Sequence, residues 1–454
     1  MFPRKYIHLD LKGAPPKVGY LKDLFPVLRQ WGATGLCIEW EDMLPFEGRF
    51  EVVRSPDAYS RKDVAAILAA ARNAGLDVMP LVQTFGHLEF VLKHGAFTAL
   101  REQPDDPMNL CPSHPDALAT IRELVDQVLD FHPGVRAIHL GADEVWTLGS
   151  CAACAPVAGG AGKAALFLRH VKPLLEHVRG RGVEALIWDD MLREWPVEKL
   201  KEIAGLAAPV VWRYGADIEQ RLPEGMWQRF AALPGLWAAS AFKGAGGVDI
   251  VWPDFGNRAA NHAAGVAKAG SVPFQGMILT GWSRYSHFAA LCEILPVGLP
   301  ALALSLRILE AGGFTDGLRR EVFESLGLGD MPFVHARTED ITSLPAGNFP
   351  GADVFRLAGK LQGARALMDR VRGDEHGHFP QYNGGRLDAG RIRRTIRHAQ
   401  DAAKIAEEAK ADIRRPLARI LFRADVKEIL DAKVNRIVKD ARSFCRKAAP
   451  LAGG

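Results

Sequence analysis

The chain has 454 residues, of which 48% are hydrophobic and 24% charged, with 45 glycines and 28 prolines. This composition is that of a globular protein and excludes disordered, collagenous and fibrous classes. The 57 basic and 53 acidic residues leave a net charge of +4, which gives no global signal for a nucleic-acid or membrane-surface partner. The length suits two or three domains, or one barrel of roughly 250–300 residues with an appendage.

Export and membrane insertion are not predicted. The N-terminus runs into a strand-like segment at residues 6–10 without an apolar core of signal-peptide length. The longest apolar tract, 288–306, is interrupted by Glu293, Pro296 and Pro300, which predicts a buried helix and not a membrane span. Six cysteines are too few for a disulfide scaffold, so we expect a reducing, cytoplasmic location.

Eight short apolar runs alternate with amphipathic stretches over the first 310 residues or so. The runs are 6–10, 35–40, 78–82, 137–140, 185–188, 210–214, 237–240 and 277–280, and the helical patterns between them include 20–31, 61–74, 115–132, 163–180 and 258–269. Because the runs lack polar alternation, they suit parallel strands buried on both faces. Eight such units predict an α/β fold, a (β/α)8 TIM barrel. The alternative, a doubly wound open sheet, usually has fewer strands and a glycine-rich first turn, which this chain lacks.

The pattern stops after about residue 328. A proline- and glycine-spaced region, 331–349, leads into helical stretches, of which the last two are 391–415 and 416–447. We therefore divide the chain into a barrel, 1–325, and an α-helical C-terminal region, 326–454. Residues 391–447 hold 17 Lys and Arg against 8 Asp and Glu. Apolar residues recur there at helical spacing and aromatic residues are scarce, which favours packed helices over a nucleic-acid surface.

The ends of the predicted strands are rich in carboxylates and tryptophans. In a barrel these positions form the active site. Tryptophan faces stack on the apolar face of a sugar ring, and carboxylates bind hydroxyls and supply acid–base chemistry. The strand-end tryptophans are Trp40, Trp188, Trp212 and Trp282.

The strongest local signal is the end of the fourth run, where Asp143 and Glu144 follow small residues. Two neighbouring carboxylates repel each other, so one pKa rises, which suits a general acid at neutral pH.

These residues resemble a known family. Residues 141–145 (GADEV) match the Gly-x-Asp-Glu signature of family 20 glycoside hydrolases, the β-N-acetylhexosaminidases, and 80–87 (PLVQTFGH) keep that family's Pro, Gly and His in register. The segments 83–89 (QTFGHLE), 139–146 (HLGADEVW) and 279–288 (LTGWSRYSHF) resemble the hexosaminidase D branch. The resemblance covers roughly residues 1–320.

The resemblance implies retaining exo-hydrolysis of terminal N-acetylglucosamine or N-acetylgalactosamine, in which the substrate's 2-acetamido oxygen is the nucleophile and an oxazolinium ion forms. It implies that Glu144 is the general acid and then the base, while Asp143 orients the acetamido N–H and stabilises positive charge. Tyr214 or Tyr285 would hold the acetamido oxygen. The remaining substrate-binding residues implied are Trp188, Trp212, Trp282 and His87.

The family's strand-one arginine, which binds sugar hydroxyls, has no clear match here. Asp10, Lys12 or Arg284 could replace it, so the gluco or galacto preference stays open. The partner predicted is an N-acetylhexosaminide, small or part of a glycoconjugate. No cofactor, nucleic acid or membrane is expected, and a homodimer is the assembly considered.

Cys151 and Cys154 form a single Cys-x-x-Cys, which is half of a structural zinc site, and no second pair follows at usable spacing. A reduced dithiol is therefore expected and no metal is assigned.

Two alternative functions remain at this point. One is a metal-dependent barrel isomerase or nuclease with a ligand set drawn from His87, Glu89, Asp143, Glu144, Asp189 and His287. The other is an inactive carbohydrate-binding barrel, which would be expected to have lost one of the two carboxylates.

Overall fold

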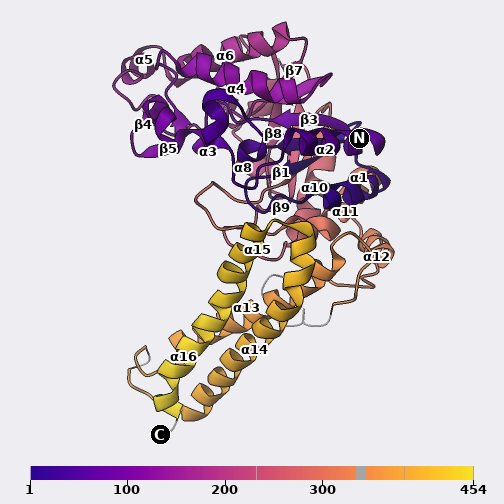
Figure 1. The fold of residues 1–454 in the computed structure, drawn as a ribbon, viewed down its shortest axis with the longest axis vertical. Helices are drawn as coiled ribbons and strands as arrows, with labels where there is room; N and C mark the ends of the chain where they lie inside the picture. The colour runs from indigo at the N-terminus through magenta and orange to yellow at the C-terminus, as the bar shows by residue number, and fades with distance from the viewer. Residues whose placement is uncertain (1, 232, 334–343, 383, 453–454) are drawn as a thin grey trace.

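The computed structural model describes residues 2–231, 233–333, 344–382 and 384–452. Eight parallel strands close into a barrel in the order β1-β10-β9-β8-β7-β6-β3-β2 (Figure 1). They are β1 (Lys5–Asp10), β2 (Gly35–Glu39), β3 (Asp77–Leu81), β6 (Ala137–His139), β7 (Glu184–Trp188), β8 (Ala207–Trp212), β9 (Trp237–Lys243) and β10 (Met277–Gly281). Pairing of β1 with β10 closes the barrel, with Lys5 opposite Met277. The predicted (β/α)8 fold and all eight strands are confirmed.

Helices follow the strands and surround the barrel. The longer ones are α1 (Val18–Gln30), α2 (Arg61–Asn73), α4 (Ala117–Phe131), α6 (Lys163–Gly180), α10 (Phe255–Ala269), α11 (Leu295–Ala311) and α12 (Asp316–Ser325). The short ones are α3 (Glu89–Leu92), α5 (Ala155–Gly160), α7 (Val197–Leu200), α8 (Ile218–Arg221) and α9 (Met226–Phe230). The five predicted helices correspond to α1, α2, α4, α6 and α10, and the long apolar tract forms the buried helix α11. No helix in the described part of the chain is long and apolar enough to cross a membrane.

A two-stranded hairpin, β4 (Arg101–Gln103) and β5 (Asp106–Leu110), is inserted between β3 and α4 and was not predicted. It is too short to show a clear alternating pattern. Backbone hydrogen bonds join it to the loop after β3: Leu88 N–H donates to Met108 O at 3.0 Å, and Leu110 N–H donates to Phe85 O at 3.1 Å. The hairpin therefore supports a loop at the carboxyl end of the barrel.

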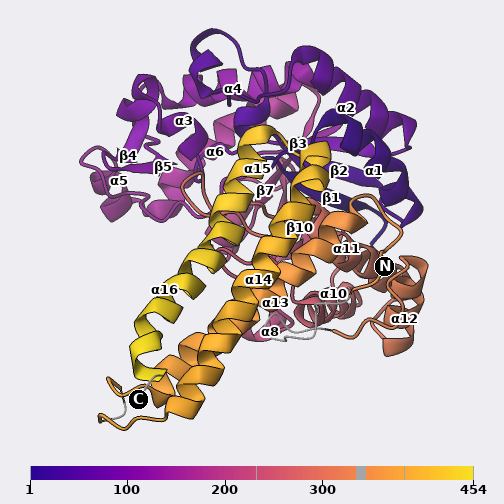
Figure 2. The same cartoon turned by 60° about the horizontal axis from the view of Figure 1, so that its bottom comes forward.

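The C-terminal helices form an arm that projects from the barrel, with the C-terminus at its far end (Figures 1 and 2). They are α13 (Ala352–His378), α14 (Ala389–Ile420), α15 (Arg423–Ile429) and α16 (Arg436–Ala452), with a π-helical segment (Leu430–Asn435) before α16. The expected break at Pro416 is wrong, because α14 continues through this residue to Ile420. Of the proline- and glycine-spaced region, residues 334–343 lie outside the described part of the chain.

Tertiary packing explains why α14 tolerates Pro416. A proline inside a helix costs about 3 kcal/mol. Here Pro416 is buried together with Ile413, Leu417 and Ile420 of the same helix. Burying a large aliphatic side chain is worth about 1.5–3 kcal/mol, so three of them outweigh the proline. The helix ends instead where Ile420 O accepts a backbone hydrogen bond from Lys17 N–H, at 2.6 Å, after β1.

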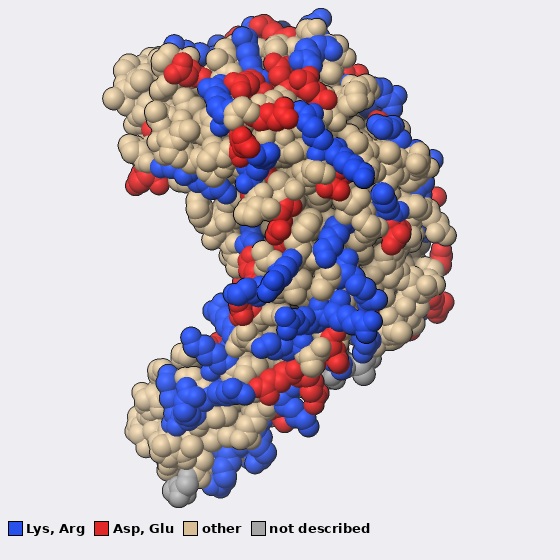
Figure 3. Space-filling view, viewed as in Figure 1, with Lys and Arg blue, Asp and Glu red and all other residues tan. Residues whose placement is uncertain are grey.

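The base of the arm is attached to the barrel. Ala14 N–H donates to Asp425 Oδ1 at 3.2 Å, and Lys433 forms an ion pair with Asp249. Basic side chains are numerous on the visible surface of the arm (Figure 3). Only the base of this basic region contacts the barrel, and the rest of the arm projects away from it (Figure 1). Helix α12 ends at Ser325, and the division into two domains at that point remains a prediction.

Candidate active site

The loop after β6, called the dyad loop below, presents the two carboxylates of Asp143 and Glu144 (the dyad) in a constrained conformation. Gly141, Ala142 and Glu144 have φ angles of +61°, +67° and +50°. Positive φ is costly for residues other than glycine and is typical of functional sites. A Cβ added to Gly141 would lie 1.9 Å from Oε1 of Gln83, so a larger residue there would require the Gln83 side chain to move. Gly141 N–H donates to Nδ1 of His139 at 3.0 Å, which turns the chain as the strand ends.

His87 joins the two carboxylates. Its Nε2 lies 3.5 Å from Oδ2 of Asp143 and 3.2 Å from Oε2 of Glu144. The preceding residue, Gly86, lies so close to the dyad loop that a Cβ there would be 2.0 Å from Asp143 O. The glycine and histidine of the 80–87 motif are therefore needed together, one for the close approach of two loops and the other for the contact.

The two carboxylates have different surroundings. Asp143 is buried, and its Oδ1 has no hydrogen-bond partner among the described residues. The Glu144 side chain is 32% exposed, and its backbone N–H donates to Oδ2 of Asp190 at 2.9 Å. A buried oxygen without a partner is rare in folded proteins and suits a ligand that supplies a donor.

The electrostatics of this group follow from burial and mutual contact. Burial raises the pKa of Asp143 to about 8; the charge of His87 opposes this, and Asp190 and Glu144 add to it. The hydrogen bond from His87 lowers the pKa of Glu144, although burial opposes the shift. Burial disfavours charged His87, but its carboxylate neighbours raise its pKa to about 10. The free site thus holds a proton on Asp143 and a carboxylate–imidazolium pair between Glu144 and His87.

A cavity of about 270 Å³ opens at this point. This volume is close to the lower end of ligand pockets, about 300 Å³, and suits one sugar ring better than a long oligosaccharide. Nine of the ten predicted site residues line it: His87, Asp143, Glu144, Trp188, Trp212, Tyr214, Trp282, Arg284 and Tyr285. Residues from loops far apart in the sequence therefore meet at one place, as the barrel predicts.

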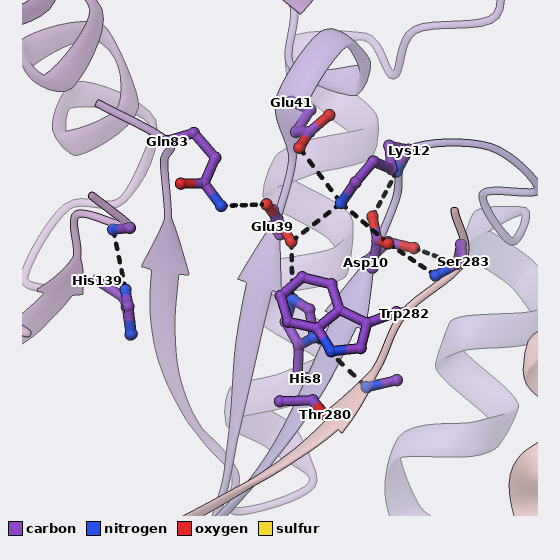
Figure 4. Close-up of polar contacts among 12 residues, drawn as sticks. His8, Asp10, Lys12, Glu39, Glu41, Gln83, His139, Thr280, Trp282 and Ser283 are labelled. Carbon is purple, nitrogen blue, oxygen red and sulfur yellow. Dashed lines mark hydrogen bonds and ion pairs between the residues drawn. The ribbon is translucent and has the colours of Figure 1, made fainter. Parts of the chain in front are cut away.

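The tenth residue, Asp10, is not in the cavity lining; it lies in a buried polar network next to it (Figure 4). Its Oδ2 accepts a hydrogen bond from Ser283 N–H at 2.7 Å and pairs with Lys12 Nζ at 3.0 Å. Lys12 also lies 3.5 Å from Glu39 and 3.4 Å from Glu41. Asp10 therefore positions Lys12, which lines the cavity, and does not itself reach the space that a ligand would fill.

Lys12 and Gln83 are cavity residues that are absent from the ten predicted. Both residues follow predicted strands, and this position is the sequence signal that could have identified them as cavity residues. Gln83 Nε2 donates to Oε1 of Glu39 at 3.0 Å, and Gln83 Oε1 has no partner among the described residues (Figure 4). Burial opposes a charge on Lys12, but Asp10, Glu39 and Glu41 raise its pKa well above the usual value. The cavity lining thus includes one buried cation, Lys12, and one amide, Gln83, whose oxygen has no partner among the described residues.

The aromatic residues have distinct environments. Trp188 is buried and its Nε1 has no partner among the described residues. Trp282 Nε1 donates to the Tyr214 hydroxyl at 3.0 Å, and the rings of Trp212 and Tyr214 stack at 5.3 Å. Tyr285 is 42% exposed. Trp40, the fourth strand-end tryptophan, stays in the core, where it contacts His132 and not the cavity.

Arg284 is held by the helical arm. Its guanidinium is paired with Glu428 of α15 and donates to Ala289 O at 2.8 Å. The C-terminal region therefore fixes a residue of the cavity wall, which the sequence did not predict.

The ligand set considered for a metal-dependent enzyme does not converge within the described residues. Arg193 binds both oxygens of Asp189 at 2.8 and 2.9 Å. His287 is paired with Glu41 on the other side of the barrel mouth from Asp189. An acid pair next to tryptophans in a small cavity is instead the arrangement of a glycoside hydrolase.

Comparison with known proteins agrees with this class. The catalytic domain of glycosyl hydrolase family 20 matches residues 24–227. Hexosaminidase D of Homo sapiens is 42% identical over 369 residues, which are 78% of this chain and 74% of that protein. Hexosaminidase D of Bos taurus is 43% identical over 338 residues, 72% of this chain and 98% of that protein. The fold also resembles a chitobiase of Flavobacterium johnsoniae, with a TM-score of 0.53 and 14% identity over 99% of this chain and 72% of that one. The chain belongs to glycosyl hydrolase family 20.

Proposed function

We propose that the protein is a retaining β-N-acetylhexosaminidase that removes terminal N-acetylglucosamine or N-acetylgalactosamine with the help of the substrate's own 2-acetamido group. The observation that carries the proposal is the pair Asp143 and Glu144, joined by His87 in a cavity for one sugar ring. The family and the two hexosaminidase relatives support the same activity.

In this mechanism Glu144 protonates the leaving oxygen and then deprotonates water, and Asp143 accepts the acetamido N–H. The free site holds its proton on the other member of the pair, because the pKa of Asp143 is raised and that of Glu144 is lowered. A bound sugar moves this proton from Asp143 to Glu144. Its acetamido N–H donates to the unpartnered Oδ1 of Asp143 and favours the carboxylate, while the ring covers Glu144 and favours its protonated form. The number of protons in the site does not change.

Tyr214 is the proposed donor to the acetamido oxygen. Its hydroxyl is beside Trp282 in the cavity, and the charges of Asp143 and Glu144 act on it. The Tyr285 hydroxyl instead accepts a hydrogen bond from Gly247 N–H at 2.9 Å at an exposed position. Tyr214 can donate its own proton to a substrate while still accepting the hydrogen bond from the indole.

The sugar hydroxyls are proposed to bind Gln83 Oε1 and Trp188 Nε1, which are buried polar atoms without partners among the described residues. Lys12 and Arg284 supply positive charge at the cavity, although carboxylates already bind both cations. The tryptophans Trp188, Trp212 and Trp282 form the apolar walls.

The test is hydrolysis of aryl N-acetyl-β-glucosaminide and N-acetyl-β-galactosaminide beside the plain aryl β-glucoside. We expect turnover of the acetamido substrates, no detectable turnover of the glucoside, and competitive inhibition by an oxazoline-mimicking thiazoline. Asp143→Asn should abolish the activity, and Glu184→Gln, at an exposed position at the start of β7, should not. A trapped glycosyl–carboxylate adduct would overturn the mechanism. Sugar binding without turnover would instead establish an inactive carbohydrate-binding barrel.

A reducing, cytoplasmic compartment and a homodimer complete the proposal. All six cysteines are free thiols, which supports a reducing environment. The exposed Trp146 and Phe288 are apolar surface that a second copy could cover. Light scattering of the purified protein gives the mass, and a single-chain mass would exclude the dimer.

A further inference from the structure

Four side chains outside the cavity converge on one point near the dyad loop. Glu102 lies on β4, Cys111 follows β5, and Cys151 and Cys154 precede α5. One ligand atom from each lies within 4.8 Å of the others. Cys111, Cys154 and Glu102 are buried, and Cys151 is half-buried. The Cys-x-x-Cys motif thus acquires two further candidate ligands from the hairpin, which is a different segment of the chain.

The sulfur separations fit coordination and not a covalent bond. Sγ of Cys111 lies 3.5 Å from Sγ of Cys151 and 3.6 Å from Sγ of Cys154. A disulfide requires about 2.05 Å. Tetrahedral zinc, with Zn–S bonds of about 2.3 Å, places its sulfurs about 3.8 Å apart. The observed spacing needs a movement of only a few tenths of an ångström to accept the ion.

Glu102 is oriented as a fourth ligand. Its Oε1 accepts three backbone hydrogen bonds, from Gly149, Ser150 and Cys151, at 3.0, 2.8 and 3.0 Å. Its Oε2 is buried and has no hydrogen-bond partner among the described residues. The three bonds fix the carboxylate while one oxygen remains available, which is how outer hydrogen bonds orient a metal ligand.

We propose that Glu102, Cys111, Cys151 and Cys154 bind one structural Zn²⁺ ion. Binding breaks three S–H bonds, forms three Zn–S bonds and one Zn–O bond, and releases three protons to solvent, with no change in oxidation state. Three thiolates and one carboxylate around a divalent ion carry a net charge of −2, the same as the common Cys₄ zinc site. Four protein ligands fill the tetrahedron, so the ion has no open position for catalysis.

Neighbouring donors suit thiolates at this site. Cys154 N–H donates to Sγ of Cys151 at 3.3 Å. Sγ of Cys154 lies 3.1 Å from the Ser113 hydroxyl, which can donate to the sulfur once the thiol has lost its proton. Such hydrogen bonds to the ligand atoms stabilise their charged form.

The ion would connect the parts of the chain that hold the active site. Cys151 follows Glu144 by seven positions, in the loop that carries the dyad. The hairpin that supplies Glu102 and Cys111 is hydrogen bonded to the loop that carries His87, through Leu88 and Leu110. One metal ion thus restrains both sides of the contact between His87 and Glu144.

The test measures metal in the full-length protein, purified under reducing conditions from zinc-supplemented medium and dialysed. We expect about one zinc per chain by mass spectrometry of the element, and loss of most of it in Cys151→Ser and Cys154→Ser. Cys445→Ser, at a half-buried cysteine of α16 outside the cluster, is the matched control and should keep it. His87→Gln should also keep it, which separates this site from metal bound in the cavity.

Cobalt provides a readout that does not depend on folding of the cysteine variants. Wild-type protein reconstituted with Co²⁺ should show the thiolate-to-metal charge-transfer band and the intense visible bands of tetrahedral cobalt. Removing zinc with a strong chelator should lower Tm. Less than about a tenth of an equivalent of zinc in the wild type, an octahedral cobalt spectrum, or a disulfide between Cys111 and either other cysteine would overturn the proposal. None of these readouts depends on the proposed hydrolase activity.

Discussion

The pH dependence of kcat/KM should report the shared proton of the active site. In the proposed mechanism, catalysis requires one proton shared by Asp143 and Glu144, and the free enzyme holds that proton on Asp143. Above the Asp143 pKa, about 8, the proton is lost and none is available for Glu144. Because the pKa of His87 is about 10, the imidazolium persists through this range. On the alkaline limb of the profile, kcat/KM should therefore fall as pH rises through about 8. On the acid limb, kcat/KM should fall only below the usual pKa of a glutamate side chain, because the pKa of Glu144 is lowered.

His87→Gln removes the positive charge that lies 3.5 Å from Asp143. A cation at this distance lowers a carboxylate pKa by about 1–3 units, so its loss should raise the pKa of Asp143 by that amount. The alkaline limb should then move upward by about 1–3 pH units, and one unit corresponds to about 1.4 kcal/mol. The acid limb should also move upward, because Glu144 loses its ion pair.

The assay is a stopped measurement of aryl N-acetyl-glucosaminide hydrolysis at low substrate concentration across the pH range in which the fold is intact by circular dichroism. His177→Gln is the matched control, because it removes another histidine paired with an aspartate, Asp126, at 2.8 Å. An alkaline limb that stays in place or moves downward in His87→Gln would refute the assignment of the shared proton to this group.

Three further predictions concern single groups. Glu144→Gln should reduce turnover of substrates with poor leaving groups by about 10²–10⁴-fold and that of activated aryl glycosides much less; equal losses would contradict its role as general acid. Tyr214→Phe should reduce kcat by about 10²-fold while Tyr285→Phe has little effect, and the reverse order would identify Tyr285 as the acetamido donor. Deletion of residues 391–454 should cause aggregation, because α14 and α16 cover apolar side chains of the arm and because Arg284 would lose its partner Glu428. A soluble, fully active truncated protein would refute that account. Tight, salt-dependent binding of the intact chain to DNA or RNA would refute it as well.

Much of the barrel could be predicted because its signals are local. Each strand is an apolar run buried on both faces, so no partner is needed to recognise it, and strand ends in a parallel barrel meet at one mouth whatever the loop lengths. That rule is sufficient to bring Trp188, Trp212 and Trp282 to the same cavity as Asp143. It failed for Asp10 and Trp40 because a strand end fixes the position of the backbone and not the direction of the side chain.

The remaining features depend on contacts between segments that are distant in the chain. Helix α14 continues through Pro416 because the packing of this helix in the arm outweighs the cost of an internal proline, about 3 kcal/mol. The unpartnered oxygens of Gln83 and Asp143 are visible only when every neighbour is placed. Arg284 is fixed by a carboxylate 144 positions away. The sequence by itself determined which residues form strands and where the acid pair lies, because each of these features is recognised from a short segment of the chain. The tertiary structure decided the charge states, the arm's contact with the cavity and the cluster of Glu102 with three cysteines. Electrostatic and coordination energies depend on distances between segments, which no local sequence pattern contains.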